Sequence, residues 1–251
     1  MRVLLVLLAI MVVLFIVAIA SSRATDNEIK VFKFCNGKPK FRLGIVASVH
    51  GNEPAGFRAC VRLMSKDWFK EWKNIEIVVI PAGNPYGLRN GIRWSRYLLK
   101  PDINRNFGSE SGDDPISRQI LKAVKSCDMV LDFHEGWGYY LEGKGSVGST
   151  LMCTDTKLAH AVAVIAQRAL NANIENPIKK FTVIGDKQCD IKQTLRCYMH
   201  KKGIPYILTE TSGQNNIQPI ELRMYQVITI IKSALLWIQL INTDTINANS
   251  V

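Results

Sequence analysis

Two apolar segments of this chain each end at a histidine, and this arrangement restricts the folds open to it. Residues 43–49 read Leu-Gly-Ile-Val-Ala-Ser-Val and are followed at once by His50, and residues 129–133 lead in the same way to His134. Short continuous apolar runs are typical of buried strands. Both histidines are therefore expected to leave one sheet at the ends of its strands.

The rest of the chain alternates predicted strands with segments of helical periodicity. Strands are expected at residues 43–49, 75–80, 129–134, 150–154 and 204–209, and helices at 55–64, 115–126, 157–170, 191–201 and from about 219 onward. A loop rich in Gly, Asn and Pro runs from residue 81 to about 112, and long loops in compact domains are usually functional. Alternating strands and helices predict a three-layer α/β/α domain with a mostly parallel mixed sheet.

An N-terminal hydrophobic segment precedes this domain. Residues 3–20 are eighteen apolar residues without a charge, which is long for a signal core and near the lower limit for a membrane-spanning helix. We expect residues 1–27 to be a signal peptide or signal anchor plus linker, and residues 28–251 to be the catalytic domain. This predicts the secretory route, with the protein either secreted or anchored to the membrane by a single pass through residues 3–20. If residues 3–20 stayed as an anchor, the bulk of the chain would be expected in the cytosol, because basic residues follow the segment more densely than they precede it.

Charge and cysteine content bear on partners and compartment. The net charge of +11 favours acidic partners, but the basic residues are scattered and not interleaved with aromatics, so no nucleic acid is expected. The six cysteines show no C-x-x-C spacing, which argues against a structural zinc site of that type. Disulfides and buried free thiols are both open.

Three residues are candidate metal ligands. His50 and Glu53 are three apart in a His-Gly-Asn-Glu segment, and His134 comes from the second strand. Catalytic zinc is bound by three protein ligands with nitrogen or oxygen donors and keeps a fourth position open. His-x-x-Glu alone is a weak signal, but with a second strand-end histidine it predicts one Zn²⁺ per chain.

Further polar residues lie where a hydrolase would need them. Arg96, Asn104 and Arg105 fall in the long loop, and arginine is suited to bidentate recognition of a carboxylate. Glu210 ends a strong strand, where a carboxylate can act as general base toward water. Glu135, next to His134, would point to the opposite face if the strand continues, so a role behind the ligands or at the surface is favoured over ligation.

These motifs together resemble the zinc carboxypeptidase superfamily, and especially its succinylglutamate desuccinylase and aspartoacylase branch. The matching segments, in order, are His50-Gly51-Asn52-Glu53, Asn84-Pro85, Arg96-Tyr97 before Asp102-Ile103-Asn104-Arg105, Asp132-Phe133-His134, and Glu210 after a strand. The resemblance implies a zinc carboxypeptidase-like fold over residues 42–240 and zinc bound by His50, Glu53 and His134.

The resemblance also implies roles for the other candidates. Glu210 would be the general base and then the acid toward the leaving amine, and Arg96 would polarise the scissile carbonyl, with Arg93 as its competitor. Asn104 and Arg105 would hold the substrate carboxylate. Asp132 could orient a metal-bound histidine.

The function implied is hydrolysis of an amide bond next to a free carboxylate, as in a succinylglutamate desuccinylase/aspartoacylase-like deacylase. The expected partner is a small acylated amino acid or a peptide C-terminus. Aspartoacylases carry an additional C-terminal β-rich domain for which this chain leaves no room, so a smaller, open cleft is expected. The alternatives are a metallocarboxypeptidase that trims peptide C-termini and a non-catalytic domain that binds carboxylates.

Overall fold

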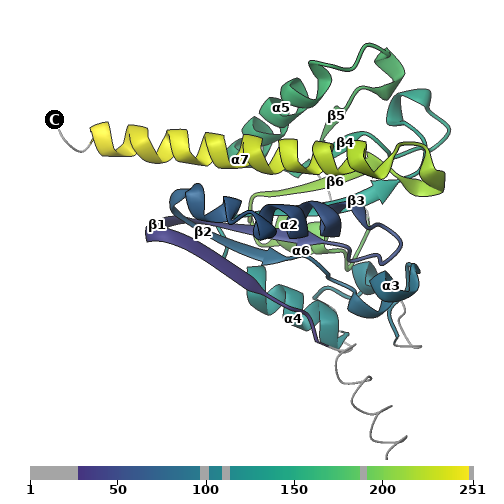
Figure 1. Cartoon of the computed structure of the whole chain (residues 1–251), viewed down its shortest axis with the longest axis horizontal. Helices are drawn as coiled ribbons and strands as arrows, with labels where there is room; N and C mark the ends of the chain where they lie inside the picture. Colours follow the sequence, from purple (N-terminus) through teal and green to yellow (C-terminus); the bar gives the residue numbers. More distant parts are fainter. Residues whose placement is uncertain (1–27, 97–101, 109–113, 187–190, 249–251) are drawn as a thin grey trace, which may run out of the picture.

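The computed structural model describes residues 28–96, 102–108, 114–186 and 191–248 (Figure 1). The hydrophobic segment at residues 3–20 lies outside the described residues. The division of the chain at residue 27 therefore stays a prediction.

One six-stranded mixed sheet forms the middle layer, with the order β2-β1-β3-β6-β4-β5. Its strands are β1 (Phe32–Ala47), β2 (Lys73–Ile80), β3 (Met129–Gly136), β4 (Thr150–Thr154), β5 (Thr182–Asp186) and β6 (Tyr206–Ser212). β3 pairs in parallel with β1 and with β6, whereas β4 runs antiparallel to β6. The predicted mostly parallel mixed sheet is confirmed.

Helices cover both faces of the sheet (Figure 1). One face carries α2 (Ala55–Ser65), α5 (Lys157–Asn171) and α7 (Ile220–Ala248), and the other carries α4 (Pro115–Val124) and α6 (Leu195–Lys201). Successive residues of a strand face opposite sides, and the core follows this rule: Leu43, Ile45 and Ala47 pack in one apolar cluster and Val46 in the other. The three-layer prediction is confirmed.

Side-chain caps explain where two predicted helices begin. The carboxylate of Asp114 accepts a hydrogen bond from the amide of Ile116 (2.7 Å) ahead of Pro115. The hydroxyl of Thr156 accepts one from the amide of Ala159 (3.2 Å) at the start of α5. Such caps satisfy amides that have no partner within the helix.

Parts of the fold differ from the prediction. The loop after residue 80 contains the short helix α3 (Pro85–Asn90), and α6 begins four residues later than expected, capped by Thr194. β5 and residues 32–42 of β1 were not predicted as strands. The first part of β1 lies mostly exposed, so its side chains lack the apolar pattern of a buried strand.

The last helix is long and apolar. By length and composition alone, residues 220–242 of α7 could cross a membrane. Val227, Ile230, Ile231, Ala234 and Ile238 of this helix are buried in the main core, which α2 and α5 share. α7 therefore packs as a core helix of the domain.

The described cysteines include both thiols and a disulfide-bonded residue. Cys60, Cys127 and Cys153 are buried thiols and Cys35 is an exposed one. Cys197, in α6, is disulfide-bonded.

Candidate active site

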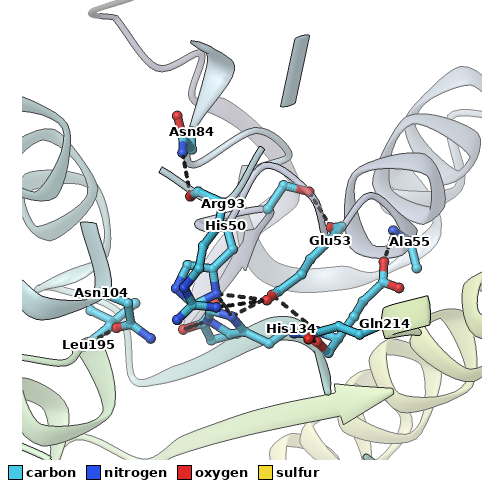
Figure 2. Close-up of polar contacts among 12 residues, drawn as sticks. His50, Glu53, Ala55, Asn84, Arg93, Asn104, His134, Leu195 and Gln214 are labelled. Atoms are coloured by element: carbon cyan, nitrogen blue, oxygen red, sulfur yellow. Dashed lines mark hydrogen bonds and ion pairs between the residues drawn. The ribbon is translucent and has the colours of Figure 1, made fainter. Parts of the chain in front are cut away.

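The three predicted ligands meet in one buried cluster (Figure 2). His50 and Glu53 lie in the turn between β1 and α2, and His134 lies in β3. Their exposed fractions are 3%, 2% and 2%, and one potential ligand atom from each lies within 4.8 Å of the others. Residues more than eighty positions apart in the chain are thus brought to one point.

Close packing fixes the turn that carries His50 and Glu53. Ser48 adopts a left-handed backbone conformation (φ 52°), and its hydroxyl donates to the carbonyl of Glu53 (2.9 Å). A β-carbon at Gly51 would overlap the backbone of Gly87 and Leu88. The glycine between the two ligands is therefore required by the close approach of α3.

The ligand atoms face one another in a way that suits a cation. The Nδ1 atoms of His50 and His134 lie 3.0 Å apart. Each also approaches a different oxygen of Glu53, at 2.9 Å for His50 and 2.8 Å for His134. Two neutral imidazole nitrogens that both present lone pairs cannot bond to each other. Two nitrogens and a carboxylate around one point match the donor set that zinc prefers.

Carboxylates behind the histidines support this assignment. The Nε2 of His50 lies 3.1 Å from Oδ1 of Asp102, and the Nε2 of His134 lies 3.3 Å from Oδ2 of Asp132. A histidine that donates its other ring N–H to a carboxylate directs its free lone pair at a metal. Asp132 was expected to orient a metal-bound histidine, and it contacts His134. The corresponding contact of Asp102 with His50 was not predicted. The residues fit a bound zinc ion.

The carboxylates of Asp102 and Asp132 each accept hydrogen bonds from a further side chain. Arg93 donates to Oδ2 of Asp102 from Nη2 (3.0 Å) and from Nε (3.2 Å). The hydroxyl of Tyr206 donates to Oδ2 of Asp132 (2.7 Å). Tyr206 was not predicted as a site residue, because its side chain reaches Asp132 only through the pairing of β3 with β6.

The charges around the ligands alter their titration. Burial alone would lower the pKa of His134, but the carboxylates of Asp132 and Glu53 raise it well above its usual value. The pKa of His50 is also raised, since Glu53 and Asp102 outweigh the effect of burial. The metal-free cluster therefore holds a proton more tightly than ordinary histidines do.

We expect zinc binding to release that proton. A raised histidine pKa means that the imidazole is protonated below that pKa, and a metal must displace the proton to bind. Zinc affinity should accordingly weaken as the pH falls. Calorimetric titration with Zn²⁺ in buffers of different ionisation enthalpy measures the release, and binding heats that are identical in all buffers would contradict it.

His50 and Glu53 of the cluster line a cavity of about 420 Å³. Its polar lining includes His50, Glu53, Arg93, Asn104, Arg105, Thr194, Arg196, Glu210 and Gln214. Its apolar lining comprises Trp137, Val147, Met152, Ile191 and Leu208. The prediction named four site residues besides the metal ligands. Glu210, Asn104 and Arg105 are in the described lining of the cavity, and Arg96 is not.

Glu210 stands beside the metal cluster. It lies opposite His134 in the ladder between β3 and β6, and directly opposed residues project to the same face of a sheet. Burial raises the pKa of Glu210 to about 8, and the negative charge of Glu53 adds to this effect while the two histidines oppose it. A carboxyl group so perturbed in a cavity is typical of functional sites.

Asn104 and Arg105 enter the cavity from the short helical turn Ile103–Arg105. The carboxylate of Asp102 caps this turn at the amide of Asn104 (2.9 Å). Oδ1 of Asn104 accepts from the amide of Leu195 (3.0 Å), so the opposite end of this side-chain amide, the NH₂ group, can only donate. Nη1 of Arg105 donates to the carbonyl of Asn104 (2.7 Å).

The two candidate arginines have different surroundings. Arg96 packs with its guanidinium 5.7 Å from the ring centre of Tyr86 and is absent from the described lining of the cavity. Arg93 lines the cavity, and its Nη1 lies 3.5 Å from Oε1 of Glu53. Asn84 fixes this segment by donating to the carbonyls of Arg93 (3.2 Å) and Trp94 (3.1 Å). Of the two, Arg93 therefore lies nearer the metal cluster, and the choice of the arginine that polarises the carbonyl stays a prediction.

The fold is an α/β domain with a mixed sheet, and its His-Glu-His cluster lies after the end of β1 and in β3. This combination defines the class of zinc carboxypeptidase-like proteins. Within this class, the model of the succinylglutamate desuccinylase/aspartoacylase catalytic domain matches residues 39–169, just over half of the chain. The chain belongs to this family. No curated protein sequence matches it.

Solved structures share the fold. The chain resembles the cell shape determinant Csd4 from Helicobacter pylori, with a TM-score of 0.68, 19% identity, and coverage of 84% of this chain and 54% of Csd4. It also resembles the mDAP-bound form of Csd4, described as a D,L-carboxypeptidase (TM-score 0.65, 20% identity, coverage 80% and 53%). A candidate metallopeptidase from Shewanella amazonensis matches with a TM-score of 0.60 at 20% identity, covering 82% of this chain and 81% of that one. The chain spans about half the length of Csd4, and at these identities the likeness shows the fold alone.

Proposed function

We propose that this chain is a zinc-dependent hydrolase that cleaves an amide bond next to a free carboxylate. The observation that carries the proposal is that one cavity is lined by Glu210, Arg105 and two members of the His50–Glu53–His134 cluster, His50 and Glu53. This arrangement supplies ligands for a metal, a base and a carboxylate-binding cation within reach of one small substrate.

Glu210 is assigned the proton transfers. Zinc bound at the cluster supplies Lewis acidity and makes water more acidic. Glu210 takes a proton from the attacking water and gives it to the leaving amine, and one carboxyl group can serve both steps because it is regenerated in the second. Its raised pKa suits a group that must accept and then donate a proton near neutral pH.

The remaining residues bind and orient the substrate. Arg105 and the NH₂ group of Asn104 hold the free carboxylate, and Arg93 places positive charge near the carbonyl that is attacked. Preorganised charge of this kind favours the transition state because negative charge develops on that oxygen. The apolar wall accepts the acyl group or a side chain.

Matched substrate pairs test the proposal. N-acyl amino acids and peptides with a free carboxylate should be hydrolysed by the zinc-loaded protein, whereas the same compounds with an amidated carboxylate should react far more slowly. The released products are measured by mass spectrometry. Equal rates for free and amidated members of each pair, or no hydrolysis of either, would contradict it.

Two versions of the activity are supported by different observations. Membership of the succinylglutamate desuccinylase/aspartoacylase family supports deacylation of a small N-acyl amino acid. The likeness to Csd4, a D,L-carboxypeptidase whose structure has been determined with a tripeptide bound, supports removal of a C-terminal residue from a peptide. The product distinguishes them, since the first liberates an acylate and the second liberates an amino acid from a peptide.

The choice between Arg93 and Arg96 can be tested by replacing each with methionine. We expect Arg93→Met to lower kcat by roughly 10²–10³-fold, the range seen when a donor to the developing oxyanion is lost, and to exceed the effect of Arg96→Met. Zinc content is measured in both variants, because Arg93 also contacts Asp102. A larger loss for Arg96→Met at full zinc occupancy would return the role to Arg96.

We also propose that the chain enters the secretory route and is secreted or anchored by residues 3–20. The apolar segment and the disulfide-bonded Cys197 support this, because disulfides persist mainly in oxidising compartments. Sequencing the N-terminus of the native protein and extracting membranes with alkaline carbonate test it. A cytosolic protein that begins at Met1 would contradict the proposal.

A further inference from the structure

Glu135 follows the metal ligand His134, and its side chain leaves the opposite face of β3. The carboxylate is buried, with 2% of the residue exposed. Its Oε1 accepts from the amide of Ala55 (2.6 Å). Its Oε2 forms an ion pair with Nη1 of Arg223 in α7, and Arg223 is itself 5% exposed.

The main chain of Glu135 makes two further contacts toward the site. Its amide donates to Oε2 of Glu53 (3.1 Å), and its carbonyl accepts from Nε2 of Gln214 (2.8 Å). Figure 2 shows Ala55 beside Glu53 and Gln214 beside His134. Glu135 therefore follows His134 directly in the chain and touches the ligand Glu53 through its amide. Its carboxylate also holds the start of α2, two residues after Glu53.

Space is left for this ion pair by a glycine. A β-carbon at Gly213 would overlap Oε2 of Glu135 and would lie 2.7 Å from Nη1 of Arg223. A buried ion pair is a poor source of stability, because removing two charges from water offsets much of their attraction. An arrangement that also needs an adjacent glycine calls for a role other than stability.

We propose that Glu135 is a positioning residue of the metal site, and that its buried carboxylate, held by Arg223, sets the spacing between His134 and the His50–Glu53 pair. The carboxylate of Glu135 anchors Ala55, the first residue of α2. The backbone of Glu135 follows His134 directly and bonds to Glu53. Loss of the anchor frees the two halves of the cluster to separate. This inference rests on the proposed function, because it assumes that the cluster binds zinc.

Metal affinity of the full chain tests the inference without any substrate. We expect Glu135→Ala to weaken Zn²⁺ binding, measured by competition with a chromogenic chelator, by about 10–100-fold, as is usual for residues that support metal ligands. Glu135→Gln should lose less, since its amide oxygen can still accept from Ala55. With saturating Co²⁺, the visible absorption spectrum of Glu135→Ala should differ from that of the wild type, because the ligand geometry is altered.

Two further variants keep the test decisive. If Glu135→Ala does not fold, the double variant Glu135→Gln/Arg223→Met removes both charges while keeping similar shapes, and it should also weaken zinc binding. Asn171→Ala is the matched control, because Asn171 bonds the backbone of Phe181 (2.8 Å) away from the site; it should lower the Tm and leave zinc affinity unchanged.

The outcomes separate the two proposals. Unchanged zinc affinity and an unchanged Co²⁺ spectrum in the Glu135 variants, with only the Tm lowered, would overturn the positioning role and leave the proposed hydrolase standing. A wild-type chain that binds no zinc would overturn both. Zinc binding by the wild type without hydrolysis would contradict the proposed function alone.

Discussion

Replacing Glu210 with glutamine should lower kcat by about 10²–10⁴-fold, the usual contribution of a general acid–base group, with zinc still bound at one ion per chain. Glutamine has nearly the same shape but cannot take a proton from water. Because Glu210 lies opposite His134 and does not belong to the ligand cluster, the cluster should stay intact. Steady-state kinetics on a cleaved substrate and metal analysis by mass spectrometry measure the two quantities.

A surface variant provides the comparison. Glu221→Gln makes the same chemical change on the exposed side of α7, and its kcat should match the wild type. Undiminished turnover in Glu210→Gln would remove Glu210 from the mechanism. Loss of zinc along with turnover would instead make Glu210 part of the metal-binding set.

The second large effect is expected at the metal. Zinc at a hundred times its dissociation constant should stabilise the wild-type chain by about 2.7 kcal/mol, which corresponds to a rise in Tm of roughly 5–10 °C for a domain of this size. His134→Ala removes one of the ligand nitrogens, and we expect this variant to show no rise at the same zinc concentration and no activity.

Calorimetry with and without zinc measures both proteins, and circular dichroism confirms that His134→Ala is folded. Removing zinc from the wild type with a chelator should abolish activity, and adding zinc should restore it. An equal Tm rise in His134→Ala would place the ion elsewhere. Full activity after exhaustive chelation would contradict a zinc-dependent reaction.

The fold could be predicted where burial leaves a pattern in the sequence. The apolar runs that begin at residues 43 and 129 formed the buried end of β1 and most of β3, because strands covered on both faces read as continuous apolar segments. The first part of β1 and β5 could not be found in this way. Residues 32–42 are largely exposed, and β5 is a short strand at the edge of the sheet.

The candidate site was predictable only in part. His50, Glu53 and His134 could be proposed because ligand types at strand ends have recognisable spacings. Arg93 and Arg96 could not be distinguished. They lie three residues apart in an irregular loop, and such a loop has no periodicity from which the directions of their side chains could be predicted. Asp102, Tyr206 and the Glu135–Arg223 pair act through contacts between distant elements, which spacing along the chain does not encode.

The place of β6 in the sheet has a consequence for assembly during synthesis. β2, β1 and β3 form one group of neighbours and β4 and β5 form another, and β6 is the strand that joins them. Residues 206–212 leave the ribosome after all five other strands, so the two groups remain separate until then. The strand that unites them also carries Glu210, and the nascent chain therefore acquires its proposed base only in the step that completes the sheet.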